Sequence, residues 1–279
     1  MKPLLIIPPA PSHWPGLRDM LVEMNSQSLD DVERRVMGGV PGAEDVFAVI
    51  GSTGQYVASA SISKRGDVGI LSHVYTRPDH RRRGYARQLT DAVLSWFDMT
   101  GGKWLVLATT TEFDEALYRK FGFEPLCRAA WAPHDRLTAV RRSPGVTGDP
   151  YGGLPDKVEI RDVTRADIPL IALFLQYRLG PDPRVPLGES AVTAKFFAQD
   201  LVTHQERNAC LLMGAFQGAR LTGLATLAID KTGDRTYAMM MPHADAPDAL
   251  RQALQAAARE KGYTQVDFPM EALAHSSND

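Results

Sequence analysis

The sequence predicts a mixed α/β fold, a mixed sheet covered by helices, that is built twice along the chain. Apolar runs of strand length alternate with longer stretches in which apolar residues recur every three to four positions, as they do on one face of a helix. A stretch rich in proline and glycine, Ser143–Asp156, interrupts the 279 residues near the middle. Strands and helices then follow again in the same order. This repetition predicts two related domains, 1–145 and 157–279, joined by a linker at 146–156.

In the first half, Leu4–Ile7 reads as a strand, and a helix follows from Ser12 to Met24 with Pro15 in its first turn. The sequence Gly51–Gly54 predicts a hairpin between two strands. A helix after Tyr85 is expected to end at Gly101. The other expected elements are a helix at 28–37, strands at 45–50, 55–63, 68–75 and 103–109, a helix at 113–121 and strands at 124–131 and 137–142.

The second half is expected to repeat this order but to stop early. The expected elements are a strand at 157–163, helices at 167–179 and 189–204, strands at 209–216, 220–229 and 235–241, a helix at 247–261 and a strand at 264–269. The final helix and two strands of the first half have no counterpart in the second half, so the second copy is predicted to be incomplete. We expect its open sheet edge to pack against the first half or against a second copy of the chain, as in a homodimer.

The composition indicates a cytoplasmic protein with no membrane and no nucleic-acid partner. Hydrophobic residues make up 44% and charged residues 23% of the chain, which is ordinary for a globular protein. A net charge of −2 argues against a general nucleic-acid binder. The two cysteines, Cys127 and Cys210, show no metal-binding spacing, so we expect reduced thiols and no metal. No apolar run approaches the roughly 18 residues that cross a bilayer.

The turn between the strand at 68–75 and the following helix has the character of an anion site. It reads Arg81-Arg82-Arg83-Gly84-Tyr85-Ala86, which is both basic and small. The first turn of a helix leaves backbone N–H groups unpaired and carries the positive end of the helix dipole. Gly84 and Ala86 add no bulk, so a phosphate group could approach that backbone closely.

The pattern Arg-x-x-Gly-x-Ala after a strand, with Pro78 three residues ahead of it, resembles the acyl-CoA pyrophosphate loop of GNAT-type N-acetyltransferases. Downstream, Ala116–Phe123 (ALYRKFGF) resembles the closing helix of the same family, at a fitting distance and in the right order. The resemblance covers residues 1–145. It implies a GNAT fold, acetyl-CoA as cosubstrate and transfer of an acetyl group to an amine.

The resemblance also implies which residues form the site. The backbone of Val74, Tyr75 and Thr76 corresponds to the strand that pairs with the pantetheine arm. The pyrophosphate cradle corresponds to Arg81, Arg82, Arg83, Gly84, Tyr85, Ala86 and Arg87. Tyr118 matches the tyrosine that resembling enzymes use to protonate the departing thiolate, and a phenol with a pKa near 10 suits that step.

The general base is left open by the sequence. Family bases often stand nine or eleven residues ahead of the loop, where this chain has Ser72 and Ile70, and neither can accept a proton. His73 lies beside them, but strict alternation places it on the opposite face unless a bulge intervenes. Glu112, expected at the end of the following strand, is the second candidate, and deprotonation by water is the third.

Two function classes follow from these features. One is an acetyltransferase that acts on a primary amine of a small molecule or a peptide, with an acceptor that the sequence does not name. The alternative is a CoA-binding sensor or scaffold that has lost catalysis, given the residues at 70 and 72. The second half carries Asp245 and Asp248 around Pro247 in place of the arginine and glycine of the loop, so we expect no second CoA site there.

Overall fold

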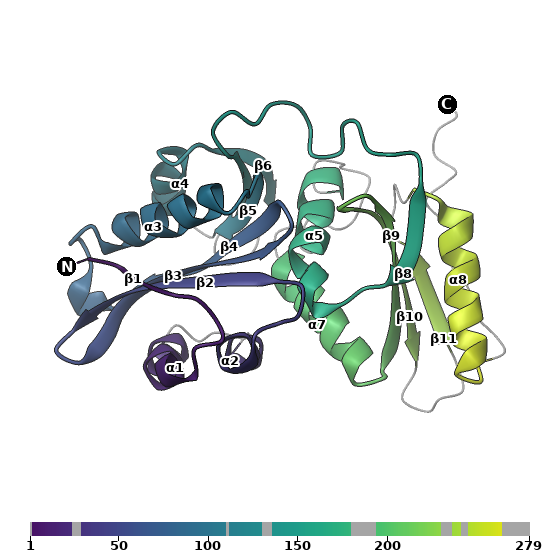
Figure 1. The fold of residues 1–279 in the computed structure, drawn as a ribbon, viewed down its shortest axis with the longest axis horizontal. Coiled ribbons are helices and arrows are strands. Elements are labelled where there is room, and N and C mark those ends of the chain that lie inside the picture. The colour runs from purple at the N-terminus through teal and green to yellow at the C-terminus, as the bar shows by residue number, and fades with distance from the viewer. Residues whose placement is uncertain are drawn as a thin grey trace.

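The chain forms two sheets, one from each half. The structure, a computed structural model, describes residues 2–23, 29–109, 112–129, 136–179, 194–229, 236–240 and 245–263. The first sheet has seven strands in the order β1-β2-β3-β4-β5-β7-β6, and the second has the order β11-β10-β9-β8 (Figure 1). In each sheet the first four strands of that half pair with their neighbours in sequence, as a repeated fold requires.

The elements of the first half agree with those expected from the sequence. The strands are β1 Leu4–Ile6, β2 Glu44–Ser52, β3 Gln55–Arg65, β4 Val68–Thr76, β5 Trp104–Thr109, β6 Phe123–Ala129 and β7 Arg136–Arg142. The helices are α1 Trp14–Glu23, α2 Leu29–Gly38, α3 Tyr85–Met99 and α4 Glu112–Arg119, with short 3-10 turns η1 Pro11–His13 and η2 Pro78–His80.

The second half repeats the order strand, helices, three strands, helix. Its strands are β8 Val158–Asp162, β9 Cys210–Gln217, β10 Arg220–Ile229 and β11 Thr236–Met240. Its helical elements are η3 Arg165–Asp167, α5 Ile168–Leu173, the π-helical segment η4 Phe174–Leu179, α7 Ala194–Glu206 and α8 Pro247–Glu260. The predictions of a mixed α/β fold and of the repeat are therefore confirmed. The strand expected at 264–269 lies outside the described residues.

Helices cover both faces of the seven-stranded sheet. On one face, α3 buries Leu89, Val93 and Phe97 against residues of β2, β3 and β5. On the other face, α1 and α2 bury an apolar cluster that includes Phe47 of β2. The amphipathic pattern of each helix thus determines its apolar face, and the alternation of each strand supplies a matching surface.

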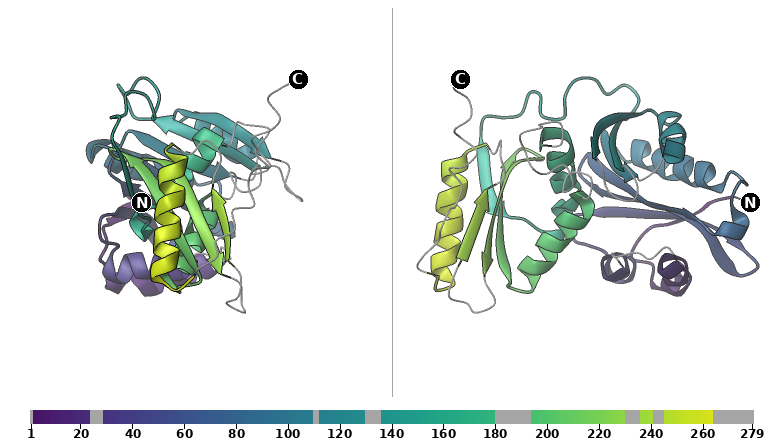
Figure 2. Two further views of the ribbon diagram at one scale, coloured as in Figure 1. Left: turned by 90° about the vertical axis from the view of Figure 1, so that its right-hand side faces the viewer. Right: turned by 180° about the vertical axis from the view of Figure 1, so that it is seen from behind.

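The two halves share one hydrophobic core. Helix α5 lies between the two sheets and packs on the same face of the first sheet as α1 and α2 (Figures 1 and 2). Its cluster includes Val68 and Ile70 of β4 and, from the second sheet, Leu212 and Phe216 of β9. The halves therefore meet through a helical layer. Of the two packings expected for the open sheet edge, contact with the first half is wrong for the described residues, because the buried apolar helix α5 makes that contact. Packing of the edge against a second copy of the chain stays a prediction.

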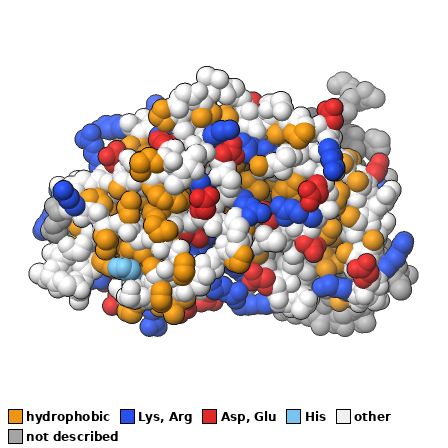
Figure 3. Space-filling model, viewed as in Figure 1, with side chains coloured by type: hydrophobic (Ala, Val, Ile, Leu, Met, Phe, Trp, Pro, Cys, Tyr) orange, Lys and Arg blue, Asp and Glu red, His pale blue; other side chains and the backbone are white. Residues whose placement is uncertain are grey.

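Ion pairs surround this shared core. Asp31 of α2 accepts hydrogen bonds from Arg165 of η3 at 2.6 Å and from Gln199 of α7 at 2.8 Å. At the other end of the interface, Asp67 in the β3–β4 turn pairs with Arg220 of β10. Figure 3 shows acidic and basic side chains interspersed on the face where the halves meet. The second half is thus fixed to the first by charge as well as by apolar packing.

The stretch predicted as a linker packs against both halves. Ser143 donates a hydrogen bond to Asp98 of α3, and the carbonyl of Pro150 accepts one from Arg220 at 2.9 Å. Gly145, Gly148 and Gly153 all have positive φ, which explains why the stretch is rich in glycine. Among the described residues, no helix combines the length and apolar composition needed to cross a bilayer.

Candidate active site

The loop before α3 has a backbone suited to an anion. Gly84 is the residue preceding the helix and has φ +75°, a left-handed conformation that glycine adopts without strain. It has no side chain to cap the helix, and no acidic residue stands in the first turn. Because the first N–H groups of a helix have no partner within it, those of Tyr85, Ala86 and Arg87 are available to a ligand.

The space beside this backbone is open. A Cβ atom placed on Gly84 would meet nothing within 4 Å, so the glycine is required for its conformation rather than for packing within the chain. Arg81, Arg82 and Arg83 are exposed. Arg82 and Arg87 form no hydrogen bond or ion pair with the part of the chain that the structure describes. The loop thus combines unpaired amides, space and cationic side chains, which together fit a pyrophosphate group.

The other two loop arginines are held by the backbone. Arg81 donates from Nε to the carbonyl of Thr76 at 3.1 Å, and Arg83 donates to the carbonyl of Asp79 at 3.1 Å. Tyr85 differs from its neighbours because its side chain is buried against the core of α3. The structure therefore leaves Tyr85 only its backbone N–H for a ligand.

Strands β4 and β5 are paired only at their beginnings. They form the parallel pairs Val68–Trp104, Gly69–Leu105 and Ile70–Val106, and the ladder stops there although β4 continues to Thr76. The edge of β4 from Leu71 onward is consequently free of β5 and leads towards the loop. An extended ligand chain could form backbone hydrogen bonds along it.

The side chains along this free edge alternate between the faces of the sheet. Val74 packs towards α3, and Tyr75 packs towards α1 and α2. Thr76 is the last residue of β4 and is half-buried. The three residues that the family resemblance assigns to the pantetheine arm therefore lie between the loop and the point where β4 separates from β5.

A β-bulge in β4 changes the direction of His73. The register with β3 shifts between the pairs Ser59–Tyr75 and Ser61–Ser72, and His73 has φ +53°. As a result, Ser72 and His73 both line one cavity, although they are adjacent in the strand. His73 was a candidate base only if a bulge interrupted the alternation of β4. That bulge is present, and it turns His73 towards α2.

His73 is buried and held by its neighbours. Its Nδ1 lies 2.8 Å from Oγ of Ser61, and its ring stacks against Phe47 with 6.5 Å between the centroids. The cavity beside it measures about 20 Å³, which is enough for one water molecule. An imidazole in this position could exchange a proton with such a water.

The charged side chains that border this cavity neutralise one another. Arg35 of α2 bonds to Asp31 and Asp45, each at 2.8 Å, and to Ser63 at 2.7 Å. Burial alone would lower the pKa of Arg35, but the charges and hydrogen bonds of Asp45 and Asp31 raise it above its usual value. The guanidinium is therefore a fixed cation in the wall that separates His73 from the second half.

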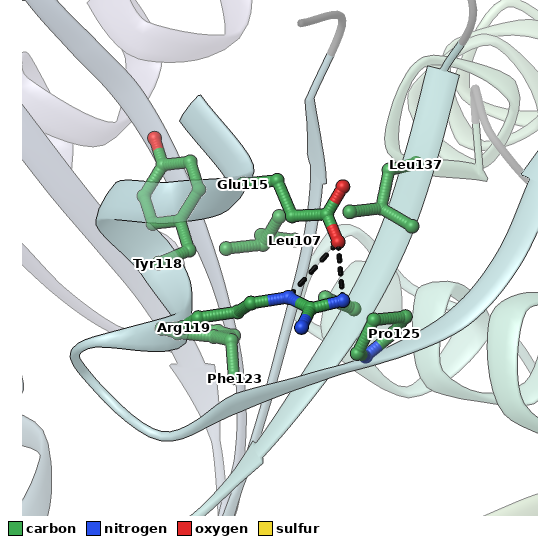
Figure 4. A pocket seen from close by; sticks show the side chains of 8 residues that line it. Leu107, Glu115, Tyr118, Arg119, Phe123, Pro125 and Leu137 are labelled. Atoms are coloured by element: carbon green, nitrogen blue, oxygen red, sulfur yellow. Dashed lines mark hydrogen bonds and ion pairs between the residues drawn. The ribbon is translucent and has the colours of Figure 1, made fainter. Parts of the chain in front are cut away.

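Tyr118 lies on the opposite face of the sheet from His73. Its side chain is 8% exposed and belongs to the core formed with α3, where its ring meets Phe123 edge to face at 5.7 Å. It also lines a cavity of about 10 Å³ next to the ion pair Glu115–Arg119, and its hydroxyl points away from that pair (Figure 4). The acid and base candidates thus lie on opposite faces of the sheet.

Glu112 differs from the sequence expectation. It is the first residue of α4, whereas β5 ends at Thr109, and its side chain lies outside the described part of the chain. Its role as a base stays a prediction.

The sequence reasoning missed the hydroxyl groups beside His73. Ser59, Ser61 and Ser63 alternate along β3 with Ala58, Ala60 and Ile62, which pack towards α3, so the three serines face the side of α1 and α2. Three serines at every second position of a strand, on a face expected to be buried, are a readable signal of a polar site.

The corresponding loop of the second half has different chemistry. Ala246 precedes α8 with φ +52°, which is the left-handed conformation that Gly84 adopts before α3. Asp245 beside it pairs with Arg178 at 3.0 Å. Pro247 has no N–H group, and Asp248 stands in the first turn. Within the described residues, no group of three His, Cys, Asp or Glu side chains could hold a metal ion.

Comparisons with solved structures give similar chains of low identity. ElaA from Escherichia coli is 16% identical, with a TM-score of 0.42 over 50% of this chain and 99% of that one. A tandem GNAT protein from the clavulanic acid biosynthesis pathway is 14% identical, with a TM-score of 0.42 over 98% of this chain and 93% of that one. The ribosomal-protein-S18-alanine N-acetyltransferase from Escherichia coli is 16% identical, with a TM-score of 0.41 over 53% and 97%.

No curated protein sequence matches the chain. A sequence family described as an acetyltransferase (GNAT) domain matches residues 43–125. The matched segment begins just before β2 and ends in β6, so it contains the bulged strand, the basic loop and the helix that carries Tyr118. Over this segment, the chain is similar to the acetyltransferase (GNAT) domain family.

Proposed function

We propose that this chain transfers an acetyl group from acetyl-CoA to a primary amine. The observation that carries the proposal is the loop at the start of α3, where Gly84 in a left-handed conformation leaves open space beside unpaired amides and exposed arginines. An acyl-CoA pyrophosphate has the charge and size for that loop.

The free edge of β4 extends this site into the sheet. The backbone of Val74, Tyr75 and Thr76 would bind the pantetheine arm along that edge, since β5 pairs with β4 only as far as Ile70. This arrangement brings the thioester towards the point where the two strands separate.

The chemistry requires a neutral amine, a stabilised oxyanion and a proton for the departing thiolate. The nitrogen lone pair forms a bond with the carbonyl carbon of the thioester, and the carbon–sulfur bond breaks. Tyr118 then protonates the sulfur, and the proton lost by the nitrogen passes to His73, directly or through a water. The positions of Tyr118 and His73 on opposite faces suit the two separate proton transfers.

The proton of the acceptor amine would reach His73 through a water in the small cavity on the side of α2. His73, Ser72 and Ser61 face that side, and α5 already covers the beginning of β4 there.

Two measurements on the full chain test the proposal. Calorimetric titration with acetyl-CoA should show binding, and a panel of amines, amino acids, aminoglycosides and peptides should yield at least one that releases free CoA thiol, with mass spectrometry to identify the product. Binding without thiol release from any acceptor would instead favour the inactive sensor or scaffold. No binding would contradict both functions.

A further inference from the structure

We propose that Arg141 is a positioning residue that fixes α4, the helix that carries Tyr118, relative to α3, the helix whose first turn follows the basic loop. The kinetic consequence of this inference rests on the acetyltransferase function proposed above. The placement itself follows from contacts within the first half of the chain.

Arg141 is a buried cation on the face of the sheet that α3 covers. It lies on β7, between Leu105 of β5 and Phe123 of β6. Both of these neighbours belong to the core beneath α3, and residues paired across adjacent strands point to the same face. Only 7% of Arg141 is exposed, so its guanidinium must find its partners within the chain.

Two nitrogens of the guanidinium hold the end of α3. They donate to the two carboxylate oxygens of Asp98, in the last turn of that helix, at 2.8 and 2.7 Å. Burial would raise the pKa of Asp98, but hydrogen bonds from Arg141 and Ser143 and the charge of Arg141 lower it below its usual value. The pair is therefore charged at neutral pH. A fork of two parallel bonds fixes the orientation of both groups as well as their separation.

The third nitrogen holds the turn that ends α4. Nε of Arg141 donates to the carbonyl of Phe121 at 3.0 Å. The N–H of Phe121 donates in turn to the carbonyl of Tyr118 at 2.9 Å. The ring of Tyr118 packs against Phe123, which is the residue paired with Arg141 across the strands. Both the backbone and the ring of Tyr118 are thus located with reference to Arg141.

The length of α4 makes this support important. The helix has only eight residues, and isolated helices of that length are marginal in water, so its position depends on tertiary contacts. The 15 residues of α3, in contrast, run without interruption from the basic loop to the turn that contains Asp98. Arg141 therefore connects the helix proposed to bind the pyrophosphate with the helix proposed to supply the acid. Displacement of α4 would leave binding intact and slow the proton transfer.

Amide hydrogen exchange of the full chain tests the placement without an acceptor. Arg141→Lys keeps a charge for Asp98 but removes the Nε donor to Phe121. We expect the amides of Lys120, Phe121 and Gly122, all bonded within the turn, to exchange at least 10-fold faster, and those of β5 to change little.

Two control variants come from the same stretch of chain. Arg142→Lys alters the neighbouring exposed arginine, and Ser143→Ala removes the other donor to Asp98 while the bond to Phe121 remains. Both should leave exchange in the turn unchanged. No acceleration in Arg141→Lys, or an equal acceleration throughout the sheet, would overturn the proposal.

A second variant applies if Arg141→Lys does not fold. Asp98→Asn retains the arginine and the size of its partner but removes the charge that orients the fork. It should accelerate exchange in the same turn at least 3-fold. An unchanged turn in a folded Asp98→Asn protein would likewise contradict the assignment.

Kinetics with an identified acceptor test the route to Tyr118. Arg141→Lys should lower kcat on the order of 10-fold, with little change in KM for acetyl-CoA, whereas a loss of stability alone would lower the melting temperature and leave kcat in place. In a Tyr118→Phe background, Arg141→Lys should lower kcat no further. An additive loss would overturn the proposal, because Arg141 would then act independently of Tyr118. If no acceptor releases thiol, the proposed function fails, and hydrogen exchange still decides the placement.

Discussion

Arg165 donates a hydrogen bond of 2.6 Å to Asp31, and this bond joins two residues 134 positions apart in the chain. Both side chains are less than a tenth exposed. Asp31 also accepts from Arg35 of its own helix and from Gln199, so one carboxylate links α2 to two elements of the second half. The helix that borders the His73 cavity is therefore held from outside its own domain.

Replacement of Asp31 should destabilise the whole chain. Asp31→Asn leaves Arg35 and Arg165 without their shared negative charge in a buried setting, so we expect a loss of about 3–5 kcal/mol in the free energy of unfolding. Urea denaturation followed by circular dichroism measures it. As a control, Glu124→Gln breaks an ion pair with Arg142 whose side chains are 62% and 40% exposed, and it should cost at most about 1 kcal/mol. Equal losses would show that the Asp31 network has no special weight.

The loop before α3 should respond to charge at Gly84. Any side chain there is strained by the positive φ, so Gly84→Asp is best compared with Gly84→Asn, because asparagine tolerates this conformation and has the same size. The aspartate should weaken acetyl-CoA binding at least 10-fold more than the asparagine, through repulsion of the pyrophosphate. Calorimetry on both folded variants gives the comparison. Similar affinities would place the pyrophosphate elsewhere.

Removal of the Tyr118 hydroxyl should affect chemistry rather than binding. Tyr118→Phe keeps the ring against Phe123 and should lower kcat by about 10²–10⁴-fold, with a modest change in KM for acetyl-CoA. Phe123→Leu disturbs the same ring contact but keeps the hydroxyl, so it should lower the melting temperature and reduce kcat far less. If Tyr118→Phe retains the full rate in single-turnover experiments, the residue serves packing alone.

The chain should bind one molecule of acetyl-CoA. At the start of α8, Asp245 and Asp248 replace the loop arginines, and Pro247 removes a donor. Calorimetric titration of the full chain should saturate near one ligand per chain, and Gly84→Asp should remove that single event. A stoichiometry near two, or a second event that persists in Gly84→Asp, would show that the second half also binds.

Acid should weaken the fold because several buried carboxylates are stabilised in their charged form. Burial would raise the pKa of Asp167, but hydrogen bonds from Arg161 and Thr164 outweigh it and hold the pKa below its usual value. The pKa of Asp67, bonded to Arg220, is lowered in the same way. A lowered folded pKa gives stability that is present above the unfolded value of about 3.9 and is lost as the pH falls through the folded value.

Urea denaturation at pH 7 and at several values below 4 measures this dependence. Asp167→Asn should reduce the loss of unfolding free energy as the pH falls. Asp162→Asn, at an exposed neighbouring position, should leave that loss unchanged. Equal slopes in all three proteins would contradict the assignment to Asp167.

Most of the fold follows from local patterns in the sequence. The bounds expected for β10, Arg220–Ile229, agree with the structure at both ends, and the helix expected at 247–261 is one residue longer than α8. These elements have clear periodicity and strong boundaries, such as the glycine in the turn before Arg220 and Pro247 at the helix start. Both features are encoded within a few residues, so a single sequence is sufficient to find them.

The parts that could not be predicted depend on contacts between distant residues. The direction of His73 depends on a bulge whose carbonyls bond to serines 11 to 14 positions earlier in the chain. The role of α5 as a layer between two sheets depends on the register of strands from both halves. Its apolar composition indicated burial but not the surface that would cover it. The expected site residues of the basic loop came from a motif, and their roles stay predictions.

The separation along the chain between Arg165 and Asp31 also matters during biosynthesis. When a ribosome has completed the strands of the first sheet, Val68, Ile70, Trp104, Val106 and Val140 still lack the helix that buries them. That helix begins at Ile168, and Gln199 follows another 31 residues later, so at about 5–20 residues per second the nascent chain exposes an apolar sheet face for several seconds. Folding of α2 and its surroundings is therefore completed only after the second half has emerged.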